Sequence, residues 1–230
     1  TNDINSVEEL IGDKSDRVWY YTESKTVEIG GTSIHLVPWI NSENYYDSMK
    51  KIKETNASIC MGHLEISGFE MHKGHYSEIG HPKEIFDKFN TVFSGHFHKK
   101  SDDGKIFYLG SPYQMTWSDY NCPKGFHIFD TETNEIERII NPYTIFQKIY
   151  YDDSHTDYSN VDTSQYKEKF IKLIVVNKKD IYKFDMFVDR LLSEQTHEVK
   201  IVEDFSELDA SNVSDDIAEN TQDTTTLLEK

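Results

Sequence analysis

Two histidines follow a short apolar run in the middle of the chain, and their spacing could support metal chemistry. Residues 91–93 read Thr-Val-Phe, Ser94-Gly95 breaks the run, and His96 and His98 come next at spacing i, i+2. Alternate side chains of a strand point the same way. Gly95 lets the backbone turn tightly, and imidazole is a common ligand of divalent metals. We therefore expect a metal-binding pair here, against the alternative of two ordinary surface or core histidines.

An upstream stretch repeats this pattern. The apolar run 58–61 ends in Gly62-His63, so the chain twice builds a strand, a glycine and a histidine. Between the two runs, residues 82–89 predict a helix with Pro82 in its first turn. Strand–helix–strand with polar residues after both strands is the α/β pattern, in which sites form at the carboxyl ends of strands.

These motifs, in this order, resemble the second half of a calcineurin-like metallophosphoesterase. Within that superfamily the sequence is most similar to the nuclease subunit of double-strand-break repair and recombination complexes, in the branch found in large tailed phages. The resemblance covers roughly residues 5–200. The motifs that carry it are Pro38-Trp39, Gly62-His63, Gly95-His96-Phe97-His98, Tyr108-Leu109-Gly110-Ser111-Pro112, Lys124-Gly125-Phe126 and residues 129–133.

The resemblance implies a fold and a chemistry. The fold class is α/β (α+β), the C-terminal part of a metallophosphoesterase β-sandwich flanked by helices, with a small β-α-β cap. The family holds two divalent ions, usually Mn2+, and hydrolyses DNA phosphodiesters. By resemblance, His63 and His96 bind one ion and His98 the other. The implied partners are DNA, an SMC-like ATPase subunit and, in the full-length protein, a second copy as a homodimer.

The family's other ligands come from D-x-H, G-D-x-x-D and G-N-H-D motifs, and these are absent here in usable order. Asp13 and Asp16 spell G-D-x-x-D but follow a predicted helix at 6–11, and Asp153 spells D-x-H after the histidine motifs. We interpret both matches as coincidental. We therefore expect a fragment cut behind G-N-H-D, with no assignable catalytic residue and little or no nuclease activity by itself. Restoring the upstream segment should restore Mn2+-dependent cleavage.

Composition limits what the chain does alone. Its formal net charge is −17, with nine acidic residues in 203–230, and no basic patch is visible. Such a chain binds nucleic acid poorly unless ions or partners supply positive charge. No apolar run approaches the ~20 residues of a membrane span. With only two cysteines and no signal-like start, a cytoplasmic location is expected, the host cytoplasm if the protein is phage-encoded.

The remaining sequence predicts three regions. Residues 1–150 form the phosphoesterase domain, 151–202 the β-α-β capping unit for DNA recognition, and 203–230 a disordered acidic tail. Strands are expected at 18–21, 26–29, 33–37, 106–109, 126–129, 135–140, 145–151, 170–176 and 199–202, with helices at 44–53 and 181–193.

Two loops could add residues to the site. Residues 64–81 form a long loop whose length favours a functional role, with His72, His75 and His81 as weaker ligand candidates. In the loop 111–123, Tyr113 and Trp117 could stack on bases or pack onto their own domain.

Two other functions stay open. A small-substrate metallophosphoesterase shares the Gly-His and G-H-x-H motifs, although the stretch 110–112 and the β-α-β unit favour a nuclease. A non-catalytic interaction module, with structural histidines, is favoured by the acidic balance and the missing ligands.

Overall fold

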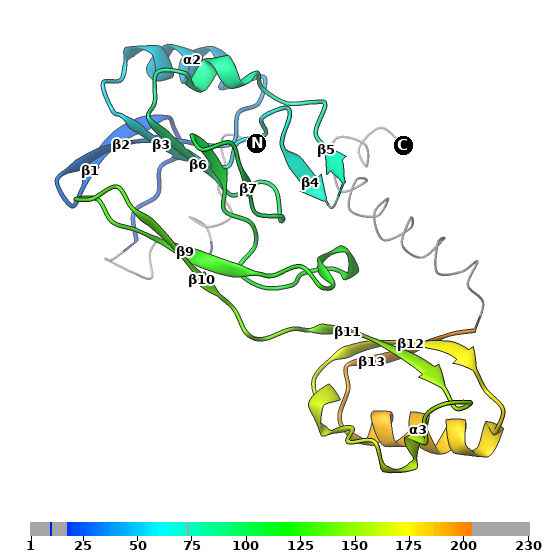
Figure 1. Ribbon diagram of the computed structural model, residues 1–230. Helices are drawn as coiled ribbons and strands as arrows, with labels where there is room; N and C mark the ends of the chain where they lie inside the picture. The colour runs from blue at the N-terminus through cyan, green and yellow to red at the C-terminus, as the bar shows by residue number, and fades with distance from the viewer. Residues whose placement is uncertain (1–9, 11–17, 73, 204–230) are drawn as a thin grey trace. The chain divides into compact units, whose positions relative to one another are not determined.

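The computed structural model describes residues 10, 18–72 and 74–203. Its contacts divide the chain into two compact units (Figure 1). Unit 1 contains the described residues up to Pro112 together with Lys124–Ile140. Unit 2 contains Tyr113–Pro123 and the described residues from Asn141 onward. The assignment of residues 1–150 to a phosphoesterase domain and 151–202 to a capping unit stays a prediction.

The core of unit 1 is a six-stranded sheet with the order β1-β2-β3-β6-β8-β7. Its central strands β2, β3, β6 and β8 run parallel, and the edge strands β1 and β7 pair antiparallel with their neighbours. The bounds are β1 Lys25–Ile29, β2 Thr32–Val37, β3 Ile59–Gly62, β6 Thr91–Ser94, β7 Ser101–Asp102 and β8 Ile106–Tyr108. Because the four central strands are parallel, their carboxyl ends lie on the same side of the sheet, where His63 and His96 follow β3 and β6.

Both faces of this sheet are covered. On one face, α2 (Tyr45–Glu54) and the 3-10 helix η2 (Lys83–Phe86) enclose a core that includes Ile52, Phe86 and Val92. On the other face, the antiparallel hairpin of β9 (Gly125–Phe129) and β10 (Ile136–Ile140) packs Phe129 and Ile136 against a cluster formed by Ile34, Ile59 and Phe93. Unit 1 is therefore a mixed α/β layered structure, which confirms the fold class expected from the sequence.

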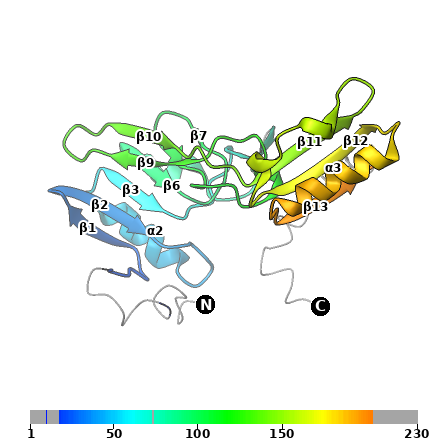
Figure 2. The same cartoon turned by 90° about the horizontal axis from the view of Figure 1, so that it is seen from below.

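Unit 2 is a parallel three-stranded sheet with a helix on one face (Figure 2). Its strands β11 (Phe146–Asp152), β12 (Phe170–Asn177) and β13 (Glu198–Val202) lie in that order, and α3 (Ile181–Ser193) connects β12 to β13. The Asp180 carboxylate caps α3 by accepting the backbone N–H of Lys183 at 3.1 Å. Buried α3 side chains meet the sheet in one cluster, which includes Phe184, Phe187 and Leu191.

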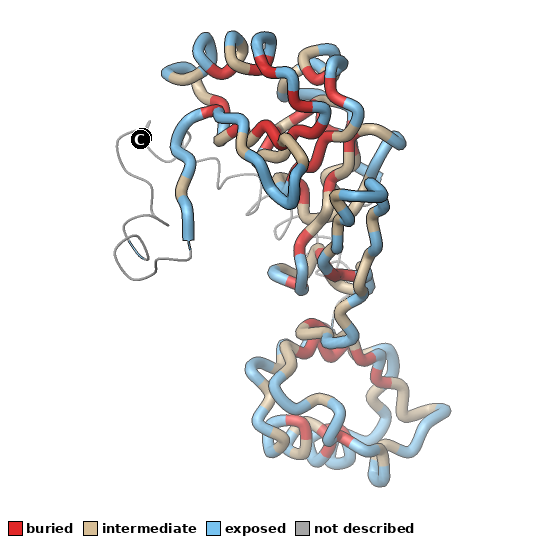
Figure 3. Tube along the Cα trace, turned by 90° about the vertical axis from the view of Figure 1, so that its left-hand side faces the viewer, coloured by how far each residue is buried: buried red, intermediate tan, exposed pale blue. Residues whose placement is uncertain are grey.

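The aromatic loop Tyr113–Pro123 belongs to unit 2. The Trp117 ring packs on Phe146 of β11, with centroids 4.8 Å apart, and the Nζ of buried Lys172 lies 4.4 Å from the Trp117 ring centre. The Gln114 side-chain oxygen accepts the backbone N–H groups of Ile145 and Phe146 at 2.7 and 3.0 Å. The loop thus covers the start of β11 and holds it by hydrogen bonds and a ring contact. Figure 3 shows buried residues inside each unit.

Some local predictions were wrong. Residues 18–21 form no strand, and the predicted helix at 82–89 is only the short η2, beginning after Pro82. The loop 64–81 contains a small hairpin of β4 (Glu70–His72) and β5 (His75–Tyr76). The predicted helix at 6–11 and the tail beyond residue 203 lie essentially outside the described residues. No helix within the described ranges has the length and apolar character to cross a membrane.

Candidate functional site

Two of the three predicted histidines meet at the carboxyl ends of β3 and β6. His63 directly follows β3, and His96 comes two residues after the end of β6. The Nε2 atom of His63 lies 3.2 Å from the Nδ1 atom of His96, and the ring centroids are 5.1 Å apart at an interplanar angle of 86°. The parallel pairing of Gly62 with Ser94 brings the two loops to the same level of the sheet edge. The repeated strand–glycine–histidine pattern therefore places two imidazoles face to edge.

Gly62 and Ser94 explain why the two loops come so close. A Cβ atom on Gly62 would lie 2.5 Å from the backbone oxygen of Val37 in β2, so only glycine fits there. The buried Ser94 hydroxyl accepts the backbone N–H of Leu64 and donates to the backbone oxygen of the same residue, both at 2.9 Å. Because Leu64 follows His63, this side chain ties the His63 loop to the strand that precedes His96.

The segment carrying His98 is held by residues that are distant in sequence. Its backbone oxygen accepts the Nζ of the buried Lys124 at 2.8 Å and the backbone N–H of Ser111 at 3.0 Å. Gly110 has a φ of +75°, and a Cβ there would lie 3.0 Å from the same oxygen. The Gly110-Ser111 and Lys124-Gly125 motifs thus position the second histidine loop, a role that sequence spacing did not reveal.

Electrostatics keep the histidine pair neutral. Partial burial, together with the charges of His63 and His98, lowers the pKa of His96 to about 4. Burial and then the charge of His98 also lower the pKa of His63. Neutral imidazole is the form that binds metal. His98 is thus near enough to influence both rings.

The pair fits one metal ion in part. Two nitrogens each about 2.1 Å from a shared ion are separated by ~3.0–3.4 Å at right-angled to tetrahedral geometry, which matches the observed 3.2 Å. Among the residues that the structure describes, however, no group of three or more His, Cys, Asp or Glu side chains is arranged to hold a metal. The described site therefore supplies a ligand pair and not a complete coordination shell.

Trp39 is a site residue whose role was not assigned from sequence. It follows β2, the neighbour of β3, and its ring lies 5.6 Å from the His63 ring and 4.9 Å from the His96 ring. The side chain is 43% exposed. The sequence signal that could have indicated this role is the position of the Pro38-Trp39 motif directly after a predicted strand. Trp39 thus forms an accessible aromatic wall beside both imidazoles.

The loop 64–81 also reaches the site. His81 pairs with the start of this loop, since its N–H donates to the Glu65 oxygen at 2.7 Å. Its side chain lines a small cavity together with Trp39, His63 and Glu65. His75 is exposed on β5, and the side chain of His72 lies outside the described set.

The other sequence candidates lie elsewhere. Tyr113 is 51% exposed, whereas Trp117 packs on Phe146 within unit 2, so of these two aromatics Tyr113 keeps the more accessible ring. Asp153 belongs to unit 2. Asp13 and Asp16 lie outside the described residues.

Comparison with known proteins supports a nuclease relationship. No family model matches the chain. The chain is a distant homologue of exonuclease subunit 1 of Enterobacteria phage T4, with 33% identity over 228 residues. The alignment covers 98% of this chain and 63% of that protein, so the chain spans less than two thirds of its relative's length.

Proposed function

We propose that this chain is part of the nuclease subunit of a phage DNA recombination and repair complex, which hydrolyses DNA phosphodiesters with two divalent ions, usually Mn2+. The observation that carries the proposal is the 3.2 Å approach of His63 Nε2 to His96 Nδ1 at adjacent parallel strand ends. This histidine pair lies in a chain that is homologous to an exonuclease subunit.

In this proposal His63 and His96 bind one ion and His98 contributes to the other. Bound ions would neutralise phosphate charge and activate the attacking water. Ser94 and Lys124 keep the histidine loops in place before substrate arrives, which avoids reorganisation during the reaction. Trp39 offers an aromatic face to a sugar or base next to the scissile phosphate.

The proposed partners follow from the chain's charge and from the family resemblance of its sequence. With a net charge of −17, the chain needs the ions and other subunits to hold DNA. We propose that an SMC-like ATPase subunit and a second copy of the full-length protein supply part of this surface. In the same proposal, unit 2 is the capping unit that contacts DNA, with Tyr113 as one of its accessible aromatic side chains.

A metal-binding experiment tests the proposal. Mn2+ binding to the chain is followed by electron paramagnetic resonance, comparing the parent with His63→Asn, His96→Asn and the control His75→Asn, which alters an exposed histidine on β5. We expect the first two variants to lose binding and the control to retain it. Equal Mn2+ binding by all four proteins would contradict the assignment of His63 and His96 as metal ligands.

Activity is then measured on the product of the complete coding sequence. We expect chelator-sensitive digestion of linear duplex DNA that His96→Asn abolishes. The small-substrate alternative is distinguished by comparing bis(p-nitrophenyl) phosphate with p-nitrophenyl phosphate, because a nuclease site prefers the diester.

A second candidate is a non-catalytic interaction module. It is favoured by one observation, the formal net charge of −17, which disfavours binding of a phosphate backbone by this chain alone. Binding of DNA or of the ATPase subunit by the complete protein, without Mn2+ binding or cleavage, would support this candidate.

A further inference from the structure

A series of aromatic rings begins at the histidine pair and runs onto α2. We call the side chains of Trp39, His81, Tyr45 and Tyr46 the aromatic strip. The Trp39 ring lies 5.6 and 4.9 Å from the two rings of the histidine pair. His81 lines the small cavity beside Trp39, and its ring stacks on the Tyr45 ring with centroids 6.0 Å apart. Tyr46 meets Tyr45 edge-on at 5.6 Å, so the rings form one connected series.

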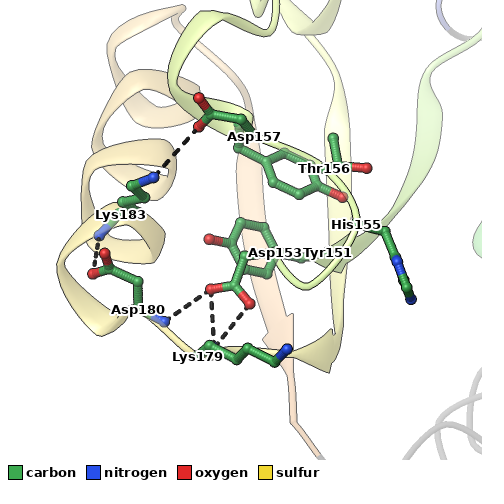
Figure 4. Close-up of a pocket in the computed structure, with 9 residues that line it drawn as sticks. Tyr151, Asp153, His155, Thr156, Asp157, Lys179, Asp180 and Lys183 are labelled. Atoms are coloured by element: carbon green, nitrogen blue, oxygen red, sulfur yellow. Dashed lines mark hydrogen bonds and ion pairs between the residues drawn. The ribbon is translucent and has the colours of Figure 1, made fainter.

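The rings of the aromatic strip are accessible to a ligand. Trp39 is 43% exposed, Tyr45 37% and Tyr46 83%. Rings that serve internal packing are buried instead. In unit 2, for example, Tyr151 is 0% exposed and stacks on Tyr158 at 4.3 Å (Figure 4). Single exposed apolar side chains are ordinary in proteins, but a connected group of them beside a site indicates a binding surface.

Hydrogen bonds hold both ends of the aromatic strip in place. The Asn44 side-chain amide donates to the backbone oxygen of Trp39 at 2.8 Å, and its Oδ1 atom accepts the backbone N–H of Asn41 at 2.9 Å. The backbone N–H of His81 donates to the Glu65 oxygen at 2.7 Å. A surface that is ordered before binding loses little conformational entropy when a ligand arrives.

The charges around the aromatic strip do not favour duplex DNA. Residues 38–49 contain no lysine or arginine. The next lysines of α2 are already paired, Lys50 with Glu54 at 3.9 Å and Lys51 with Asp47 at 2.8 Å. Proteins hold a duplex mainly by neutralising its phosphates with cations. An unpaired strand instead presents the faces of its bases, which stack on aromatic rings.

We propose that the aromatic strip binds the bases of an unpaired DNA strand and leads this strand from the histidine pair along α2. The inference rests on the proposed nuclease function and names the form of DNA that the site takes. A base on Trp39 places an adjoining phosphate beside the histidine pair, and following bases stack on Tyr45 and Tyr46. Every base has a face that can stack, so the aromatic strip selects unpaired strands and no particular sequence.

Fluorescence anisotropy with the 230-residue chain tests the binding. The probes are fluorescein-labelled oligothymidylate and an abasic strand of the same length, which has the same phosphates without bases. In the presence of Mn2+, we expect the chain to bind oligothymidylate at least about tenfold more tightly, because stacked bases add to the affinity. Equal affinity for the two strands, no binding of either, or tighter binding of a blunt duplex would overturn the inference.

Tyr46→Ala removes the most exposed ring of the aromatic strip. Tyr76→Ala is the matched control, because Tyr76 on β5 is also exposed and does not belong to the strip. We expect Tyr46→Ala to bind oligothymidylate roughly tenfold more weakly and the abasic strand as before, since one stacking contact is lost. Tyr46→Phe keeps the ring and should bind as the parent does. Equal oligothymidylate affinity of the two alanine variants would contradict the inference.

Steady-state kinetics of the product of the complete coding sequence separates this inference from the proposed function. The small diester bis(p-nitrophenyl) phosphate has no second nucleotide that could stack on Tyr46. We therefore expect Tyr46→Ala to hydrolyse it at the parent rate, while the KM for oligothymidylate rises about tenfold and kcat stays nearly the same. An unchanged KM would overturn the inference alone. A parent protein that hydrolyses neither substrate would overturn the proposed function, and base-dependent binding would then decide whether the aromatic strip holds an unpaired strand.

Discussion

Replacing Ser94 with alanine tests how the histidine pair is held. The Ser94 hydroxyl accepts the N–H of Leu64 and donates to its oxygen. In Ser94→Ala the Leu64 oxygen keeps the Tyr108 hydroxyl as a donor at 2.9 Å, but the buried Leu64 N–H loses its acceptor. An unmatched buried donor costs about 1–3 kcal/mol, so we expect unit 1 to lose roughly 2 kcal/mol of unfolding free energy.

Urea unfolding measures this change. In a Trp117→Phe background the remaining tryptophans, Trp19 and Trp39, both lie in unit 1, so fluorescence reports that unit. For an m-value of about 1–3 kcal/mol per molar urea, the midpoint should fall by about 1 M. Mn2+ affinity should fall as well, because Leu64 follows His63.

Ser101→Ala is the matched control for this experiment. The Ser101 hydroxyl is also buried, but it has no hydrogen-bond partner among the described residues. Its removal should change the unfolding free energy by less than about 0.5 kcal/mol. If Ser94→Ala and Ser101→Ala cost the same, the reasoning about the Leu64 N–H is wrong.

Three further predictions concern other parts of the fold. Gly62→Ala should destabilise unit 1 by about 1–3 kcal/mol in urea, because its Cβ would lie 2.5 Å from a backbone oxygen of β2, whereas Gly95→Ala, with 3.8 Å clearance, should be tolerated. Burial lowers the pKa of His35, so the unfolded chain takes up its proton first, and stability should fall as pH drops below about 6.5. His35→Gln should reduce this slope, which is at most about 1.4 kcal/mol per pH unit for one proton. Arg190→Lys should lower unit 2 stability by at least about 1 kcal/mol in tryptophan fluorescence, because lysine cannot serve all three carbonyls that the guanidinium contacts.

Local patterns predicted the elements around the site well. The apolar runs before Gly62 and Gly95 became β3 and β6, and the expected strands at 26–29 and 33–37 became β1 and β2. These features depend on neighbouring residues, whose preferences can be read from sequence.

Long-range contacts could not be predicted in the same way. Residues 18–21 have strand-like composition but form no strand, because pairing depends on a partner that local composition does not specify. Lys124 reaches the His98 oxygen across 26 positions in sequence. Whether Trp117 faces DNA or its own sheet depended equally on a tertiary contact, and in the structure the ring meets Phe146.

The division of the chain has a consequence for its synthesis. Residues 113–123 belong to unit 2, yet they precede residues 124–140, which complete unit 1. During translation, the loop that covers β11 therefore emerges before that strand exists, while the second face of the six-stranded sheet stays open until its hairpin appears. Neither unit is one continuous stretch of sequence, so a single proteolytic cleavage would not release either unit intact. A cut between residues 140 and 141 would separate Phe146 from the Trp117 that shields it.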